Sequence, residues 1–381
     1  MDAKGRRRLL SAMVIALPFS AIATTSMADQ VVKIGHVAAL TGGQAMAGKD
    51  SENGAHLAID EINKKGLTIG GEKITLQLEA EDDAGDPRQA TQVAQKLVDD
   101  HAVAVVGHLN SGTSIPASKI YSDAGIVQIS PAATNPAYTR QGFKTAYRVV
   151  ATDAQQGPAL ANYARTKGVK TVAVVDDSTA YGQGLASEFA KSATANGIKV
   201  LSRDATNDRA VDFRAILTKI KGENPDAIMY GGTFATGAPF AKQAMQLGLR
   251  ARIFAGDGVC NEQLAALAGS AVSNIVCSEA GAALEKMPGG EAFKTKYAKR
   301  FSQPIQLYSP YAYDAVYIIV DAMKRANSVQ PSRILAVMPK TDYSGVLGRV
   351  TFDSKGDLEH GIISLYTYKE GKKTLIDEVK M

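Results

Sequence analysis

Small hydroxyl and amide residues follow a buried, strand-like run in GHLNSGTSIPAS, residues 107–118. Leu109, Asn110 and Ser111 come directly after the apolar residues 103–106 and lead into a helix-like stretch. The unpaired N–H groups at the start of a helix, together with the Ser111 hydroxyl, can bind an anion. Small hydroxyl residues also cap helices routinely, and taken alone the segment is explained more simply by capping.

A second polar loop follows the next predicted strand, at SPAATNP, residues 130–136. Ala132, Ala133 and Thr134 lie between two prolines, so we expect a loop and not a continuing strand. Their carbonyl groups and the Thr134 hydroxyl could complement a ligand that carries both an acid and an ammonium group. A proline-fixed turn between two elements is the alternative interpretation.

Two further candidates lie in the second half of the chain. Tyr181 precedes a glycine-rich helix start in DDSTAYGQG, and Asp257 stands between two glycines in AGDGVC. An aspartate in this position could hold an ammonium group through a charge-assisted hydrogen bond, although Asp-Gly also forms ordinary tight turns. All four loops follow predicted strands, so we expect them at the same end of their sheets.

The sequence lacks the motifs of the common catalytic and cofactor sites. The GQG at 182–184 does not have the spacing of a dinucleotide loop, there is no GxxxxGK[ST], and the five histidines form no HExxH. No GxSxG surrounds Ser111, which argues against a nucleophilic serine beside His108. The absence of these motifs therefore predicts no cofactor or metal, and it disfavours a catalytic role for Ser111.

Two other polar stretches have simple interpretations. Asp82, Asp83 and Asp86 could chelate a metal ion, but a solvated loop explains them if Asp86 caps a helix with Pro87 in its first turn. FDSKGDLE, residues 352–359, predicts a surface turn.

The elements that must position these loops alternate between strand and helix. In the first half, strand-like runs occur at 31–40, 73–82, 102–108 and 125–130, with helix-like runs at 51–66 and 87–100. The second half repeats the alternation, with helices at 157–168, 182–197, 211–225 and 236–248 and strands at 171–177, 199–203, 226–232 and 252–258. This pattern predicts an α/β protein with parallel sheets. In such sheets ligands bind beyond the carboxyl ends of the strands.

The first 28 residues have the three-part pattern of a cleavable export signal. A basic start, MDAKGRRR, precedes an apolar run of roughly 15 residues, which is too short to span a membrane. Cleavage is expected after Ala28, and no cysteine stands there to accept a lipid. We therefore expect a freely diffusing, monomeric protein of the periplasm.

Charge and length restrict the remaining possibilities. The 43 basic and 38 acidic residues give a net charge of +5, which falls to about +2 without the leader. That charge is not typical of a nucleic-acid-binding protein. The 353 residues after the leader exceed what one small core holds, which predicts two domains.

The two cysteines, Cys260 and Cys277, would be exported to an oxidising compartment. We expect a disulfide between them. Two buried free thiols are the alternative, because only coordinates show whether the Cα atoms lie within bridging distance.

The chain after residue 28 resembles the periplasmic leucine/isoleucine/valine-binding proteins of ABC transporters. The resemblance is carried, in order, by VVKIGHVAALTG, NGAHLAIDEIN, DDAGDP, GHLNSGTSIPAS, SPAATNP, YGQGLA, YGG, GDGV and FDSKGD. Each segment is weak evidence by itself, but their ordered succession covers nearly the whole chain after the leader.

The resemblance implies a fold of two Rossmann-like lobes joined by three hinge strands, which close on a ligand. The N-terminal lobe would comprise residues 29–150 plus 282–358. The C-terminal lobe would comprise residues 151–281 plus 359–381.

The resemblance also implies a role for each candidate residue. Ser111 would hold the ligand carboxylate with help from Thr134, the Ala132 carbonyl and Asp257 would bind the ammonium group, and Tyr181 would come from the closing lobe. The full set expected to bind the ligand is Leu109, Asn110, Ser111, Ala132, Ala133, Thr134, Tyr181, Thr233 and Asp257.

Departures from the family pattern bear on the choice of ligand. Gly85 and Asn110 stand where the family's best-known members have a cysteine pair. Ala47 and Thr233 replace aromatic residues of the side-chain pocket, and Asp257 replaces a glutamate. A buried amide such as that of Asn110, left unpaired by an aliphatic ligand, costs roughly 1–3 kcal/mol. A smaller or more polar ligand, such as alanine or an ω-amino acid, therefore competes with leucine.

The resemblance implies a non-enzymatic receptor that captures a branched-chain or other small aliphatic or polar amino acid and delivers it to an inner-membrane ABC permease. One alternative is a ligand-sensing protein of the same fold that reports a small amide or an ω-amino acid. Another is an exported hydrolase that uses Ser111, which would convert its substrate.

Overall fold

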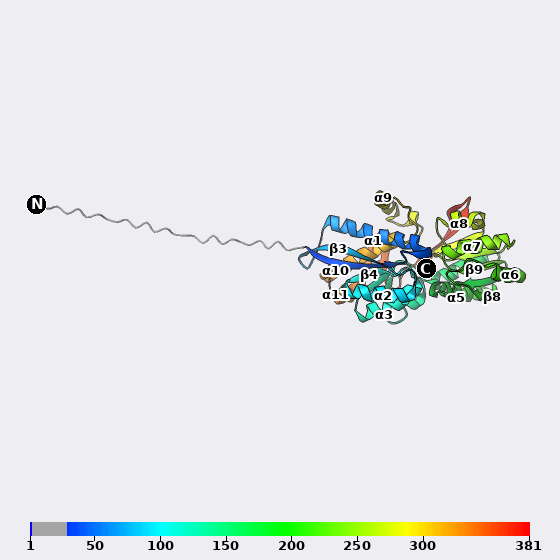
Figure 1. Ribbon diagram of the computed structural model, residues 1–381, viewed down its shortest axis with the longest axis horizontal. Helices are drawn as coiled ribbons and strands as arrows, with labels where there is room; N and C mark the ends of the chain where they lie inside the picture. The colour runs from blue at the N-terminus through cyan, green and yellow to red at the C-terminus, as the bar shows by residue number, and fades with distance from the viewer. Residues whose placement is uncertain (2–28) are drawn as a thin grey trace.

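Two lobes, each built on its own β-sheet, make up the described chain (Figure 1). The computed structural model describes Met1 and residues 29–381. Residues 2–28 of the predicted export signal lie outside the described part. The prediction of two lobes with parallel-sheet cores is confirmed.

The first sheet has six strands in the order β2-β3-β1-β4-β5-β6. All neighbouring strands are parallel except β2 and β3, which form an antiparallel hairpin. In chain order the strands are β1 (Gln30–Ala38), β2 (Leu67–Ile69), β3 (Glu72–Asp82), β4 (Ala104–Gly107), β5 (Val127–Ser130) and β6 (Ala146–Arg148).

Helices cover both faces of this sheet, because successive side chains of a strand point to opposite sides. Val106 of β4 belongs to the cluster that includes α1 and α10, whereas Val105 packs with α2 and α3. The helices of this lobe are α1 (Ala45–Lys65), α2 (Pro87–Asp99), α3 (Ser111–Asp123), α9 (Gly290–Arg300), α10 (Ser309–Ala326) and α11 (Pro331–Val337). Asp86 caps α2 as predicted, accepting hydrogen bonds from two backbone N–H groups.

The second sheet has seven strands in the order β15-β14-β11-β10-β9-β7-β8, of which β14 and β15 are antiparallel. Its strands are β7 (Thr171–Asp176), β8 (Lys199–Ala205), β9 (Ala227–Gly231), β10 (Arg252–Ala255), β11 (Ile275–Glu279), β14 (Ile362–Lys369) and β15 (Lys372–Lys380). Its helices are α4 (Asp153–Thr166), α5 (Ala180–Ala195), α6 (Arg214–Glu223), α7 (Phe234–Gln246) and α8 (Leu264–Ala268).

Both sheets are wound in the same way. The parallel strands run β3-β1-β4-β5-β6 in the first sheet and β8-β7-β9-β10-β11 in the second, so each has its second, first, third, fourth and fifth strands in that order. The winding reverses between β1 and β4 and again between β7 and β9. Such reversal points open a crevice at the carboxyl ends of the strands, where ligands bind in α/β proteins.

The chain passes between the two sheets three times, after β6, after β11 and after the β12–β13 hairpin (Asp342–Gly345 and Gly348–Thr351). The resemblance implies three hinge strands, but the crossings at 149–152, 280–283 and 352–361 contain no regular strand. The first two are joined by a hydrogen bond from the Ala151 N–H to the Ala280 carbonyl, 2.9 Å long. Short 3-10 helices occupy Gly42–Gln44, Pro136–Tyr138, Gly269–Asn274, Leu284–Lys286 and Met338–Lys340.

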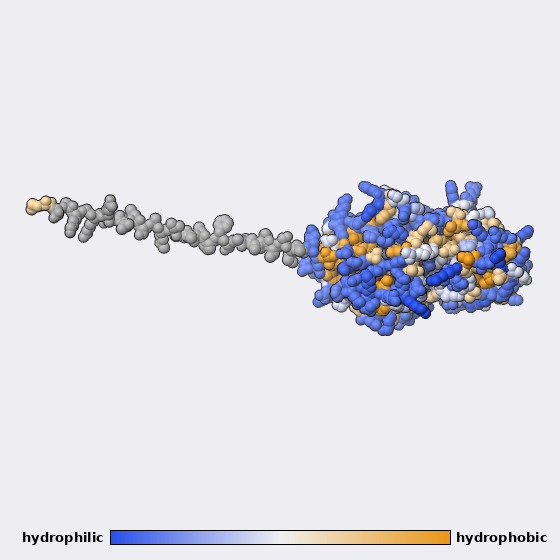
Figure 2. Space-filling view, viewed as in Figure 1, coloured by the Kyte–Doolittle hydropathy of each residue, from blue (hydrophilic) through white to orange (hydrophobic). Residues whose placement is uncertain are grey.

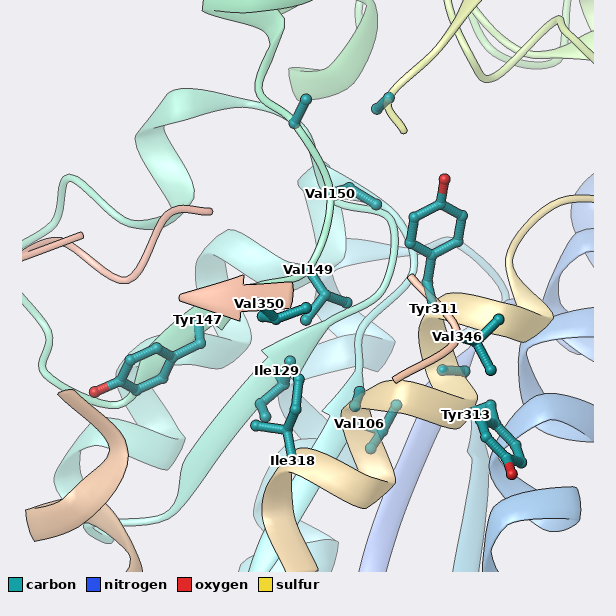
Figure 3. Close-up of a cluster of buried hydrophobic side chains, with 14 of the residues drawn as sticks. Val106, Ile129, Tyr147, Val149, Val150, Tyr311, Tyr313, Ile318, Val346 and Val350 are labelled. Carbon is teal, nitrogen blue, oxygen red and sulfur yellow. The ribbon is translucent and has the colours of Figure 1, made fainter. Parts of the chain in front are cut away.

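The core of the first lobe is a tight cluster of branched and aromatic side chains. Figure 3 shows Ile318 of α10 beneath Ile129 of β5, with Val350 of β13 beside Val149 above them. The visible outer face is mostly hydrophilic, with apolar residues scattered singly or in small groups (Figure 2). Within the described residues, no helix is both long and apolar enough to cross a membrane.

Candidate functional site

Loops at the carboxyl ends of both sheets enclose a small cavity between the lobes. Seven of the nine residues expected to bind a ligand line it: Leu109, Asn110, Ser111, Ala132, Tyr181, Thr233 and Asp257. Gln44, Gly258 and Tyr308 complete the lining. The cavity therefore draws on strand ends from both sheets, as the position of the loops predicted.

The start of α3 forms the wall contributed by the first lobe. Asn110 is the N-cap residue, but its side chain makes no capping hydrogen bond. Its Nδ2 instead donates to Gln44 Oε1 at 2.7 Å. The Ser111 hydroxyl accepts a hydrogen bond from the Asn135 N–H at 3.2 Å. The Thr113 N–H donates to the Asn110 carbonyl at 3.2 Å, whereas the Ser111 and Gly112 N–H groups have no acceptor in the described structure. This end of the helix therefore favours an anionic group.

Asp257 lies opposite, on the loop that follows β10, and only 5% of its surface is exposed. Its Oδ1 accepts hydrogen bonds from Gln156 Nε2 at 3.0 Å and from the Tyr181 hydroxyl at 3.1 Å. Its Oδ2 accepts one from the Tyr308 hydroxyl at 3.0 Å. Burial raises the pKa of Asp257, and these three donors oppose the shift. Among the described residues, no lysine or arginine lines the cavity, so a cationic ligand group is the natural partner of this carboxylate.

Tyr308 is held in place by Asp50 of α1. Asp50 Oδ2 accepts hydrogen bonds from the N–H groups of Leu307, Tyr308 and Ser309, which are 2.9, 2.7 and 2.9 Å away. An acidic side chain at the N-terminus of a helix is also favoured by the helix dipole. The start of α10 is thereby fixed to the first lobe while Tyr308 reaches the second.

A second small chamber adjoins the first. The two share Gln44, Asp257, Gly258 and Tyr308. The second chamber is otherwise lined by Ala47, Phe234, Cys260, Asn261, Gln306 and Leu307. The shared residues place Asp257 at the boundary between the two chambers.

Two of the expected residues do not line either chamber. The Ala133 carbonyl accepts a hydrogen bond from Arg148 Nη1 at 2.5 Å. The Thr134 hydroxyl is buried and has no hydrogen-bond partner among the described residues. It neighbours Asp153, and burial raises the pKa of that carboxyl group to about 8. Ala133 and Thr134 thus lie behind the cavity wall.

The expectation of a surface turn at residues 352–359 is wrong for Asp357. Its side chain is buried and accepts a hydrogen bond from Arg148 Nε at 2.7 Å, forming an ion pair. Arg148 is fully buried, and its Nη2 also donates to the Asn135 carbonyl. The turn therefore buries the Asp357 carboxylate against Arg148, which in turn binds the loop behind the cavity wall.

The aspartates before α2 are also less exposed than a solvated loop would allow. Asp83 is fully buried, and its Oδ2 lies 2.8 Å from Nδ1 of His108. Nε2 of His108 lies 3.1 Å from the Tyr121 hydroxyl. In the described part of the chain, no three potential metal ligands gather in one place.

Cys260 and Cys277 form a disulfide, and their Cα atoms are 5.4 Å apart. The expected pairing is confirmed. The bridge joins the loop that carries Asp257 to strand β11.

Sequence reasoning missed several residues of the site, among them Gln44, Gln156, Gln306 and Tyr308. All are far from the flagged motifs in the sequence, and no cofactor or catalytic spacing marks them. The polar segment before the strongly helical residues 309–326 is the one signal that could have pointed to Tyr308 as a helix-start residue.

Comparison with known protein families decides the class. Residues 31–372 match the model of a family described as periplasmic binding protein. The chain belongs to the periplasmic binding protein family. This family comprises solute-binding receptors and not enzymes, which argues against the hydrolase alternative.

Relatives of known ligand belong to the same family. The chain is 33% identical, over 97% of its length and 99% of the relative's, to the leucine-, isoleucine-, valine-, threonine- and alanine-binding protein of Pseudomonas aeruginosa. The leucine-binding protein LivK from Thermotoga maritima has a TM-score of 0.84 at 27% identity, covering 91% of this chain and 98% of its own. The branched-chain amino acid transporter substrate-binding protein LivJ from Streptococcus pneumoniae, in complex with isoleucine, has a TM-score of 0.82 at 28% identity and covers 92% and 100%.

Proposed function

We propose that the protein captures a single amino acid between its two lobes. Asp257 of the second lobe binds the ammonium group, and the start of α3 in the first lobe binds the carboxylate through the Ser111 hydroxyl and N–H. The observation that carries this proposal is the buried Asp257, which has three neutral donors but no basic residue in the cavity lining. A cationic ligand group stabilises a buried carboxylate that has no basic neighbour.

The amino acid closes the cavity by drawing two lobes together. The first lobe consists of residues 29–150 and 282–358, and the second of residues 151–281 and 359–381. A ligand stabilises the closed form only through contacts that the open form lacks. Asp257 and Tyr181 from one side, with Ser111 and Ala132 from the other, supply such contacts.

The receptor works in the periplasm as a monomer and delivers its ligand to an inner-membrane ABC permease. The family membership supports this role, and the balanced charge fits a diffusing protein. Residues 1–28 act as the export signal. The Pseudomonas aeruginosa relative is named for amino acids as small as alanine and threonine, which supports a small amino acid as the ligand here.

Thermal-shift measurements with a panel of amino acids test the proposal. The protein is first unfolded, dialysed and refolded, so that any resident ligand is removed. An amino acid at 100 times its dissociation constant adds about 2.7 kcal/mol to the free energy of unfolding. The matching amine without a carboxylate, and the acid without an ammonium group, should give no shift. A panel in which no amino acid stabilises the protein would overturn the proposal.

A further inference from the structure

Two carbonyl oxygens in the linked chambers have no hydrogen-bond partner in the described structure. They are Asn110 Oδ1 and Gln306 Oε1, and both atoms are buried. The amide nitrogens of the same side chains are occupied, since Asn110 Nδ2 donates to Gln44 Oε1 and Gln306 Nε2 donates to the Pro304 carbonyl at 3.2 Å. Each amide nitrogen has used one of its two N–H groups, whereas each amide oxygen has made no hydrogen bond at all. Buried acceptors are nearly always paired in folded proteins, so a ligand donor is expected at these positions.

Gln306 cannot readily turn its oxygen to water. Only 7% of its surface is exposed. The residues that follow it are fixed by the three hydrogen bonds from backbone N–H groups to Asp50. The amide is therefore preorganised in the wall of the second chamber, and its oxygen stays unpaired unless the ligand reaches it.

Apolar residues form part of the second chamber beside Gln306. Ala47, Phe234 and Leu307 are apolar. Asn261 is polar, and its Oδ1 accepts a hydrogen bond from the Gln263 N–H at 2.7 Å. Among the described residues that line this chamber, Gln306 therefore supplies the buried acceptor that has no partner.

We propose that the receptor prefers an amino acid whose side chain carries a hydrogen-bond donor, a hydroxyl or a carboxamide N–H, over an aliphatic one of the same shape. Gln306 is the specificity-determining residue, and its Oε1 accepts the hydrogen bond. Asn110 Oδ1 offers a second acceptor in the first chamber. This inference rests on the proposed function, because it assumes that an amino acid occupies the cavity with its ammonium group at Asp257.

Matched pairs of amino acids test the preference by calorimetry on the refolded, ligand-free protein. Threonine and valine have nearly the same shape, as do asparagine and leucine, so each pair isolates the effect of polar atoms. Leaving a buried acceptor unpaired costs roughly 1–3 kcal/mol, which corresponds to roughly a 5- to 150-fold difference in dissociation constant. In at least one pair the polar member should bind more tightly by that factor.

A substitution then assigns the preference to Gln306. Gln306→Met keeps the length of the side chain and removes the acceptor, so the ratio within the pair should fall toward one. Gln303→Met is the control, because Gln303 lies on the same loop but is exposed and lines neither chamber. This control should keep the wild-type ratio.

Failure of the inference is distinguishable from failure of the proposed function. Equal or tighter binding of the aliphatic member in both pairs would overturn the polar preference and leave the amino-acid receptor intact. A preference that survives in Gln306→Met would overturn the role of Gln306. Absence of binding for every amino acid would overturn both proposals.

Discussion

The Tyr308 hydroxyl donates to Oδ2 of Asp257 across the cavity, at 3.0 Å. Tyr308 is anchored to the first lobe through Asp50, whereas Asp257 belongs to the loop after β10 in the second lobe. A second hydrogen bond between the lobes runs from Asn135 Nδ2 to the Ala180 carbonyl, at 2.6 Å. The carboxylate that we propose binds the ammonium group of the ligand therefore also links the two lobes. On this proposal, ligand binding and lobe closure depend on one residue.

Tyr308→Phe should weaken amino-acid binding about 10- to 100-fold. The substitution removes one hydrogen bond to a carboxylate, and bonds to charged groups contribute about 1.5–3 kcal/mol. Isothermal calorimetry of the refolded protein measures the change. Tyr311→Phe is the matched control, since the buried Tyr311 hydroxyl has no hydrogen-bond partner in the described structure and points away from the labelled core (Figure 3). Equal losses in both variants would contradict a specific role for Tyr308.

Asp257→Asn should reduce affinity at least about 100-fold while the protein stays folded. The amide has nearly the shape of the carboxylate but lacks the charge that binds an ammonium group, and removing one partner of a buried charged pair costs about 3–5 kcal/mol. Because burial raises the pKa of Asp257, its charge destabilises the empty protein. The melting temperature of the ligand-free variant should therefore equal or exceed that of the wild type. A variant that unfolds, or one that binds normally, would show that Asp257 has a structural role instead.

Asp153 should make the ligand-free protein less stable as the pH rises from about 4 to about 8. Burial raises its pKa from 3.8 to about 8, so across this window the folded state holds a proton that the unfolded state has released. Stability is complete below the unfolded pKa and declines as pH approaches 8, with a slope of up to about 1.4 kcal/mol per pH unit.

Urea unfolding at several pH values measures this slope, and Asp153→Asn should remove the part due to Asp153. Asp177 and Asp314 also have raised pKa values, each near 6, so the informative quantity is the difference between the variant and the wild type. Asp99→Asn, at an exposed position, serves as the control and should leave the slope unchanged. Parallel curves for the wild type and Asp153→Asn would contradict the prediction.

The sequence allowed the fold and most of the cavity lining to be predicted, because both follow from local signals. Alternating apolar runs mark strands and helices, and polar loops at strand ends mark the face where ligands bind. Ser111 and Asp257 were found in this way, although they are far apart in the chain. Their opposition across one cavity follows from the common winding of the two sheets.

The residues that prediction missed depend on contacts between distant segments. Tyr308 and Gln306 reach the cavity because α10 packs on α1 and because Asp50 fixes the turn before it. Nothing in the local pattern of residues 303–308 reports that contact. Asp357 looks like part of an exposed Asp-Gly turn, and only the distant Arg148 explains why its carboxylate is buried.

Asp357→Asn should destabilise the protein by about 3–5 kcal/mol, because it leaves the fully buried Arg148 without its counter-charge. Since Arg148 also donates to the carbonyls of Ala133 and Asn135, the lost order should extend to the loop behind the cavity. Glu359→Gln, an exposed position on the same segment, should change the free energy of unfolding by less than about 0.5 kcal/mol. Urea unfolding of both variants separates the effect of burying the Asp357 charge from a general effect of charge on this turn. Similar small decreases in the free energy of unfolding of both variants would show that the ion pair contributes little to stability.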